Sequence, residues 1–274
     1  MKRFSIICAA LPVLIFSCTK QGNTGLNPAG ENQRLFEIIG DSASVPIAFN
    51  QFEYSGDKIS RATLSNSNTG VTDVTTFEYD GSNHYIKATD EDPNVYSEWF
   101  INDLKLPVKT VQRLKYFRNY IEVYGTSELD FSYDPHTNHL DSITTMDTNG
   151  NVVLLDLFKY TDDNITSVFQ YHLDPNRIDT FYFSYDSNAN AFRNADPLWY
   201  VYSSPAKYYV PFYNPITLVQ IFSKDMAITY SFRWYERLTY TIQYSVVNDN
   251  QLKDFYLFNE NMEPTDINAH YFYQ

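Results

Sequence analysis

Apolar and polar residues alternate with a period of two along most of the chain from residue 35 onward. The clearest example runs from Leu129 to Thr144, where Leu129, Phe131 and Tyr133 alternate with polar residues. Turn-forming residues then follow at 134–138, and the apolar alternation resumes after them. Because a period of two places apolar side chains on one face of a strand, this stretch predicts two strands joined by a turn. No stretch shows a sustained helical period.

A tyrosine that ends a strand and precedes a polar turn recurs along the chain, with a spacing of about 26 residues that is typical of a structural repeat. Two of the intervals are about twice that length, and the first is expected to hold a degenerate copy at Ile101 to Val108, where the tyrosine is missing. The repeated tyrosines are Tyr54, Tyr79, Tyr133, Tyr160, Tyr185 and Tyr244. Two strands per repeat predict hairpins laid side by side.

The expected fold class is therefore all-β. We expect a large antiparallel meander of repeated hairpins, with about fourteen to eighteen strands. Sheets of this size twist and curl instead of staying flat, so the meander should be strongly curved or rolled into an incomplete barrel. The sequence does not settle whether the sheet closes.

The aspartate that follows several of these tyrosines has a structural interpretation. Its carboxylate can accept hydrogen bonds from backbone N–H groups two or three residues further on, in an Asx-turn. His136 and His139 lie in or beside one such turn and are expected to be solvated turn histidines. The stretch from Asp147 to Asn151 resembles the start of a calcium loop, but Phe158 stands at the twelfth position. A hairpin turn is therefore expected there.

The best copies of the repeat are Phe131-Ser132-Tyr133-Asp134 and Phe183-Ser184-Tyr185-Asp186. They resemble the YD-type repeat of Rhs-like proteins. They are more similar still to a group of Bacteroidota lipoproteins of unknown function that carry degenerate copies of that repeat. The resemblance extends from Phe49 to the C-terminus. It implies the hairpin architecture and says almost nothing about chemistry.

The N-terminus has the features of a secreted, lipid-modified protein. Lys2 and Arg3 precede an apolar stretch from Ile6 to Phe16, which is shorter than the roughly 20 residues of a membrane-spanning helix. Ser17-Cys18 then resembles a lipobox. The resemblance implies cleavage before Cys18, a diacylglycerol on its sulfur and a further acyl chain, such as palmitate, on its amino group. The expected location is the cell envelope, anchored to either side of the outer membrane.

Three segments follow from these patterns. Residues 1–17 are expected to be a lipoprotein signal peptide, residues 18–33 the lipidated cysteine and a polar tether, and residues 34–274 a single all-β domain. The chain has two cysteines. Cys8 would leave with the signal peptide and Cys18 would carry lipid. The folded part therefore contains no thiol for catalysis and no disulfide.

Charge and hydropathy exclude some partners. The chain has 33 acidic and 20 basic side chains, a formal net charge of −13 and a sequence pI of about 4.7. Such a surface repels phosphate backbones, so nucleic acid is not expected as a partner. The mean hydropathy is −0.39. Charges on both strand faces also argue against the lipid-facing apolar band of an outer-membrane barrel.

Nothing in the sequence predicts an enzyme, a cofactor or a metal site. The motifs of nucleophile elbows, zinc proteases, phosphate loops and dinucleotide-binding folds are all missing. We expect a non-enzymatic envelope lipoprotein that binds a partner protein or a glycan, or has a structural role. One alternative is a carrier that holds an apolar ligand in a concave aromatic interior. A carboxylate-based hydrolase is the weakest of the three alternatives.

One aromatic-rich region interrupts the repeat and is the best candidate for ligand binding. Aromatic rings stack on sugar rings and anchor protein interfaces. A cap that covers one end of the sheet would explain the same residues without any ligand. The candidate ligand-binding residues are Trp199, Tyr200, Tyr202, Tyr208, Tyr209, Phe212 and Tyr213.

Overall fold

The fold contains sixteen β-strands in the part of the chain that the structure describes. The computed structural model describes residues 35–42, 45–56, 58–66, 70–82, 84–118, 121–173, 176–189, 223–233, 237–248, 251–262 and 264–273. The strands are β1 (Leu35–Ser42), β2 (Val45–Ser55), β3 (Lys58–Asn66), β4 (Val71–Tyr79), β5 (Tyr85–Asp90), β6 (Tyr96–Ile101), β7 (Pro107–Arg118), β8 (Ile121–Tyr133), β9 (Leu140–Met146), β10 (Val152–Thr161), β11 (Asn164–Leu173), β12 (Asn176–Ala189), β13 (Asp225–Arg233), β14 (Arg237–Asn248), β15 (Gln251–Phe258) and β16 (Pro264–Tyr273).

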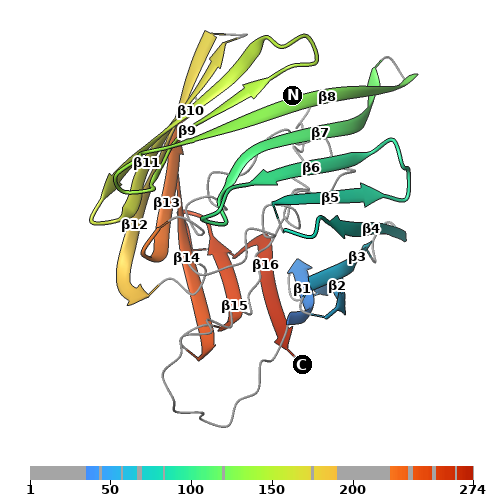
Figure 1. Cartoon of the computed structure of the whole chain (residues 1–274). Helices are drawn as coiled ribbons and strands as arrows, with labels where there is room; N and C mark the ends of the chain where they lie inside the picture. Colours follow the sequence, from blue (N-terminus) through green and yellow to red (C-terminus); the bar gives the residue numbers. More distant parts are fainter. Residues whose placement is uncertain are drawn as a thin grey trace, which may run out of the picture.

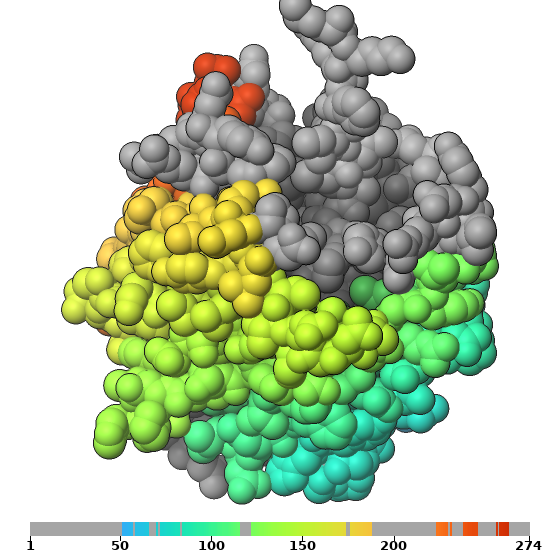
Figure 2. Space-filling model, turned by 90° about the horizontal axis from the view of Figure 1, so that it is seen from above, coloured from blue at the N-terminus to red at the C-terminus, as the bar shows by residue number. Residues whose placement is uncertain are grey.

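Each strand pairs antiparallel with the next one in sequence, and β1 pairs with β16 to close the sheet into a barrel (Figure 1). The predicted all-β antiparallel meander is confirmed, and its strand number lies within the expected range. The closure goes beyond the incomplete barrel that the sequence favoured. Pairing the first strand with the last leaves no row of unpaired N–H and C=O groups at a sheet edge. Seen from above, the strands from β8 (green) to β12 (yellow) lie along one side of a hollow (Figure 2).

The inner face of the barrel is predominantly apolar. One row of directly paired residues crosses six strands, from β5 to β10, and every member is buried. Paired residues on neighbouring strands share a face, so this row identifies the interior. Its members are Ile86, Trp99, Thr110, Leu129, Thr145 and Leu154. This burial of one face explains the alternation in the sequence.

The outer face of β5–β8 carries charges, many of them paired. Lys109 forms an ion pair with Glu128, and Lys115 Nζ lies 2.8 Å from a carboxylate oxygen of Glu122. Glu98 accepts a hydrogen bond from the hydroxyl of Tyr85. Burial, followed by this hydrogen bond, raises the pKa of Tyr85 to about 12. A membrane-spanning barrel has the opposite arrangement, with apolar residues outside and polar residues inside. On these four strands the charged side chains lie on the outer face of the barrel.

No helix in the described part of the chain is long and apolar enough to cross a membrane.

Three of the repeated tyrosines share one hydrogen-bonding role, whereas the hydroxyl of Tyr244 donates to Oδ2 of Asp186. The hydroxyl of Tyr79 donates to the backbone carbonyl of Ile59 at 2.7 Å, and that of Tyr133 donates to Pro107 at 2.8 Å. Tyr185 donates in the same way to Ile165. In each case the acceptor lies near the start of an earlier strand, 20 or 26 residues back. Burial raises the pKa of Tyr133 and Tyr185 far above the ordinary value. Each tyrosine therefore ties one hairpin to its predecessor at the end of the barrel.

The predicted Asx-turns are confirmed. One carboxylate oxygen of Asp134 accepts hydrogen bonds from the N–H groups of His136 and Thr137, both at 2.8 Å. Asp147 accepts from Asn149 and Asn151, in a turn where Gly150 has a φ of 78°. These hydrogen bonds lower the pKa of both carboxyls. The largest contribution comes from the N–H group of Thr137 for Asp134 and from that of Asn151 for Asp147. The Asp147 stretch is thus a hairpin turn, as expected.

Candidate functional site

A group of polar and charged side chains interrupts the apolar inner face on three neighbouring strands. We call this group the inner polar cluster, and it consists of Asp156, Gln170, His172, Arg177 and Asp179. The register brings it together, because Asp156 of β10 pairs with Gln170 of β11, which pairs with Asp179 of β12. His172 pairs with Arg177 in the row of Leu154. The cluster therefore lies on the wall of the barrel interior.

Three members of the cluster, His172, Arg177 and Asp179, are in direct contact. Oδ2 of Asp179 lies 2.8 Å from Nη2 of Arg177 and 2.9 Å from Nε2 of His172. Nη2 of Arg177 and Nε2 of His172 are 3.1 Å apart. The side chain of Arg177 is 35% exposed, that of His172 13% and that of Asp179 10%. Exposure thus decreases from Arg177 toward Asp179, and Asp156 is fully buried.

The second oxygen of Asp179 is the unusual feature of the cluster. Oδ1 is buried and has no hydrogen-bond partner among the residues that the structure describes, whereas Oδ2 has two. A buried acceptor that lacks a donor costs about 1–3 kcal/mol, because it has lost its water without a replacement. Such groups are rare in native proteins and call for an explanation. A ligand that brings an O–H or N–H group to Oδ1 would supply the missing hydrogen bond.

Local sequence explains how these side chains come to point inward. His172 and Arg177 face each other next to the pair formed by Leu173 and Asn176, at the end of the β11–β12 hairpin. Asp179 is two residues beyond Arg177, and residues two apart on a strand share a face. The outward neighbour Ile178 is exposed, which confirms the assignment of faces.

The sequence analysis did not identify this cluster. One signal was available: Asp156 is the only charge between Val152 and Phe158, in a stretch that is otherwise apolar. Asp179, Arg177 and His172 carry no recognisable spacing of their own. They meet only because the register of three strands aligns them.

The residues predicted to bind a ligand lie outside the described part of the chain. This holds for the lipidation site Cys18 and for the aromatic region at 199–213. Both remain predictions. The aromatic candidates are Trp199, Tyr200, Tyr202, Tyr208, Tyr209, Phe212 and Tyr213.

The two histidines of the β8–β9 turn behave differently from each other. His136 is exposed, as predicted. His139 is not a simple solvated histidine, because its ring stacks on Tyr160 with a centroid distance of 4.2 Å. Its Nε2 also lies 3.2 Å from Oδ1 of Asp163, in the turn between β10 and β11. The sequence prediction for His139 was therefore wrong, since the next turn supplies a partner that is distant in the sequence.

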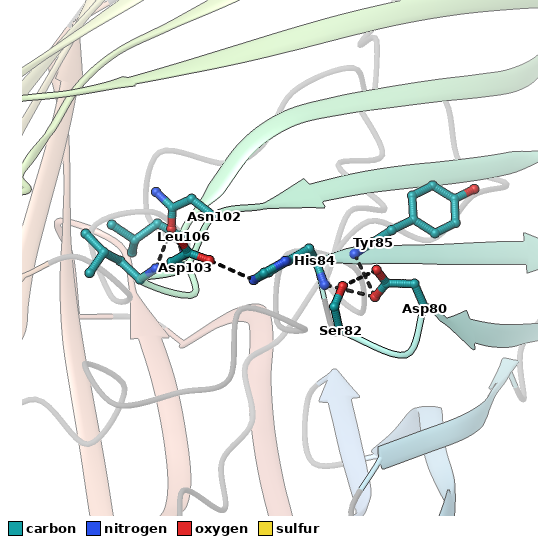
Figure 3. A network of polar contacts seen from close by, with 8 residues as sticks. Asp80, Ser82, His84, Tyr85, Asn102, Asp103 and Leu106 are labelled. Carbon is teal, nitrogen blue, oxygen red and sulfur yellow. Dashed lines mark hydrogen bonds and ion pairs between the residues drawn. The ribbon is translucent and has the colours of Figure 1, made fainter.

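A second histidine connects two other turns in the same way (Figure 3). Nε2 of His84, between β4 and β5, lies 3.2 Å from Oδ1 of Asp103, between β6 and β7. Asp80 accepts hydrogen bonds from the N–H groups of His84 and Tyr85, and Asn102 accepts from that of Leu106. Every contact in this network orders a turn or links two turns. We therefore regard it as part of the scaffold.

Within the described residues, no group of three or more His, Cys, Asp or Glu side chains could hold a metal ion.

Comparison with known proteins identifies the fold. The chain matches no family model and no curated protein. Its structure is similar to that of a porin-like protein from Bacteroides uniformis, with a TM-score of 0.56 and 14% identity over 87% of this chain and 96% of that one. A porin-like protein from Bacteroides vulgatus matches with a TM-score of 0.55 and 10% identity over 88% of this chain and 98% of that one. At these identities the likeness is one of fold alone.

Proposed function

We propose that this chain is a non-enzymatic cell-envelope protein that binds the hydroxyl-rich end of a glycan at the inner polar cluster. The observation that carries the proposal is the buried Oδ1 of Asp179, for which the described part of the chain supplies no hydrogen-bond donor. The other carboxylate oxygen of Asp179, Oδ2, contacts Arg177 and His172. The carboxylate is thereby fixed in position.

The chemistry of the cluster suits hydroxyl groups better than a charged ligand. A hydroxyl group both donates and accepts hydrogen bonds, and the cluster offers carboxylate acceptors, guanidinium donors and the amide of Gln170. Asp156 and Asp179 outnumber the single guanidinium of Arg177, so an anionic ligand would meet net repulsion. The exposure of Arg177 makes it the first group that an entering ligand meets.

The same geometry argues against hydrolysis. Glycoside hydrolysis by two carboxylates requires one on each side of the scissile bond, about 5–9.5 Å apart. The strand that carries Gln170 lies between Asp156 and Asp179. Two strand spacings therefore separate the two aspartates by about 10 Å. Both lie on the same wall of the barrel and are buried. They cannot flank a substrate, and this supports a binding role.

A lipid anchor and an envelope location are part of the proposal. The lipobox-like Ser17-Cys18 and the resemblance to Bacteroidota lipoproteins with YD-like repeats support both. The porin-like neighbours from Bacteroides are consistent with a non-enzymatic envelope protein. The anchor is tested by incorporation of labelled palmitate into the full chain. Cys18→Ser should abolish labelling, and unchanged labelling would rule out this anchor.

Glycan binding is tested with the full chain on affinity gels that contain bacterial or plant polysaccharides. We expect retardation of the wild type and at least tenfold weaker retention for Asp179→Asn, which replaces an anionic acceptor by an amide of the same shape. Asp130→Asn on the outer face of β8 is the matched control and should behave like the wild type. No retention of the wild type on any polysaccharide would overturn the proposal. Specific uptake of a fluorescent fatty acid would favour the carrier alternative instead.

A further inference from the structure

Three buried hydroxyl groups lie close together on the inner wall of the barrel. They belong to Thr110 on β7, Ser127 on β8 and Thr145 on β9, and we call them the inner hydroxyl set. None of the three oxygens has a hydrogen-bond partner among the residues that the structure describes. Thr110 is fully buried, and Thr145 is 3% exposed. Buried polar groups without a partner are costly and rare in native proteins, so three neighbouring ones call for a common explanation.

The register places the three hydroxyl groups around one apolar residue. Thr110 and Thr145 both pair with Leu129 on β8, so two strand spacings, about 10 Å in all, separate them. Ser127 precedes Leu129 by two residues and faces the same way, which places it about 7–8 Å from each threonine. On its other side Thr110 pairs with Trp99, which is also buried. A ring lying over Leu129 therefore has the three hydroxyl groups around it and the indole of Trp99 at one side.

These groups match the chemistry of a sugar ring, which carries hydroxyl groups at its edge and C–H groups on its faces. A serine or threonine hydroxyl both donates and accepts hydrogen bonds, so it can pair with any sugar hydroxyl. Leu129 and Trp99 supply apolar contact for the C–H groups. An apolar ligand would leave the hydroxyl groups unpaired.

The inner hydroxyl set continues into the inner polar cluster. Thr145 lies diagonally opposite Asp156 of β10, at about 7–8 Å. Five strand spacings separate Thr110 on β7 from Asp179 on β12, which is about 24 Å along the wall. One sugar ring cannot cover that span, whereas a chain of several sugars can. Arg177, whose side chain is 35% exposed, lies at the accessible end.

We propose that the inner hydroxyl set is a second sugar subsite, so that the barrel binds an oligosaccharide along its inner wall from β12 to β7. This inference rests on the proposed glycan binding at Asp179. It adds the length of the ligand and the residues that contact its far part. The oligosaccharide supplies the hydrogen bonds of the three hydroxyl groups. Groups held ready for a ligand in this way lower the stability of the free protein, a cost that binding sites commonly carry.

The double variant Thr110→Val/Thr145→Val tests the subsite, because valine has nearly the shape of threonine and lacks the hydroxyl. The probes are oligosaccharides released by partial hydrolysis of the polysaccharide that best retains the wild type, separated by length and titrated into the full chain by calorimetry. We expect affinity to rise with length. The double variant should bind the hexasaccharide at least tenfold more weakly and the monosaccharide unchanged. Thr144→Val, on the outer face of β9, is the matched control and should behave like the wild type.

Urea unfolding without sugar separates a binding role from a structural one. The double variant should unfold at the same urea concentration as the wild type or at a higher one, because it removes buried hydroxyl groups for which the described residues supply no partner. A lower midpoint together with unchanged hexasaccharide binding would mean that ordered water satisfies the hydroxyl groups, and the subsite would be wrong.

The calorimetry also distinguishes the subsite from the glycan proposal on which it rests. Loss of all sugar binding on Asp179→Asn, with no effect of Thr110→Val/Thr145→Val, would reject the subsite and leave the glycan proposal intact. Equal affinity of the wild type for the monosaccharide and the hexasaccharide would reject the subsite as well. A wild type that binds no sugar would overturn both.

Discussion

The outer faces of β5–β8 and β10–β12 belong to one sheet, yet charged side chains are frequent on the first, whereas Lys159 is the charge among the outward residues 155–159 of β10. On β5–β8 the outward residues form ion pairs such as Lys109 with Glu128. On β10–β12 the same row of paired positions carries Leu155, Tyr171 and Ile178. The inner face does not change in this way, since Ile86 in one region and Ile165 in the other are both buried.

The difference shows that packing restricts which side chains can occupy the inward positions of the barrel. The outward positions accept a wider range of side chains. An inward side chain must fit the packed wall, whatever strand it comes from. An outward side chain contributes little to folding, so its chemistry can differ between strands.

The largest expected effects test whether the two regions share the same interior. Ile86→Ala on β5 and Ile165→Ala on β11 each remove a buried side chain, and each should lower the free energy of unfolding by about 2–5 kcal/mol. Urea denaturation measures both. We expect the two variants to lose similar amounts of unfolding free energy. A large loss for Ile86→Ala with almost none for Ile165→Ala would show that the β10–β12 region lacks a packed interior.

The tyrosine hydrogen bonds should have the next largest effect. Tyr133→Phe and Tyr185→Phe keep the ring but leave a backbone carbonyl without its hydroxyl donor. Each should cost about 1–3 kcal/mol, because an unsatisfied buried acceptor has lost its water. Tyr124→Phe, whose hydroxyl contacts Asp92 on an exposed surface, is the control and should cost less. Equal effects for all three would contradict a special role for the repeated tyrosines.

A smaller effect, the salt dependence of side-chain coupling, distinguishes the outer face of β5–β8 from that of β10–β12. A double-mutant cycle on Lys109 and Glu128 should give a coupling of about 0.2–1 kcal/mol at low salt, because the pair is partly exposed. The coupling should fall as salt is raised, since ions screen exposed charges. A cycle on Leu157 and Phe169 should show no salt dependence. Salt-independent coupling at Lys109 would mean that the charged face is shielded.

The smallest effect concerns the turns and depends on pH. The folded-state pKa values of Asp134 and Asp147 are lowered by hydrogen bonds from the backbone. Their stabilising contribution is therefore complete above the unfolded pKa of about 3.9 and is lost as pH falls through the folded pKa. Asp134→Asn should make stability fall less steeply with acid in denaturation curves between about pH 5 and pH 2.

Asn102 supplies the control for this pH dependence. Its side-chain oxygen accepts hydrogen bonds from the N–H groups of Leu104 and Leu106 at 3.0 Å, in a turn of the same kind without a titratable group. Asn102→Ala should therefore destabilise the protein equally at every pH. An acid-dependent loss for this variant would mean that the pH effect arises elsewhere.

Much of the fold was predictable because its rules are local. Alternation over a few residues identified the strands, and the Asp-rich turns followed from the reach of one side chain to nearby N–H groups. The stretch from Ile101 to Val108, where the sequence placed a degenerate copy of the repeat, contains the end of β6 and the start of β7. His139 was predicted wrongly, because its partners Tyr160 and Asp163 come from a different hairpin.

The candidate site was not predictable for the same reason. Asp179 has no local feature that distinguishes it from the other acidic residues of the chain. Its importance arises from Arg177 and His172 at Oδ2 and from the lack of a donor to Oδ1 within the described ranges of the chain. Those relations depend on the register between β11 and β12 and on burial, which no short window of sequence contains.

The sequence by itself determined an antiparallel meander of hairpins with one buried face and aspartate-capped turns. Periodicity and turn chemistry act over a few residues, so they can be recognised without a structure. Only the tertiary structure decided that Leu35 pairs with Tyr273 and closes the barrel. It also decided that five polar side chains meet on the inner wall and that charged residues gather on the outer face of β5–β8. These features depend on which distant strands lie side by side, and that is settled when the whole sheet closes.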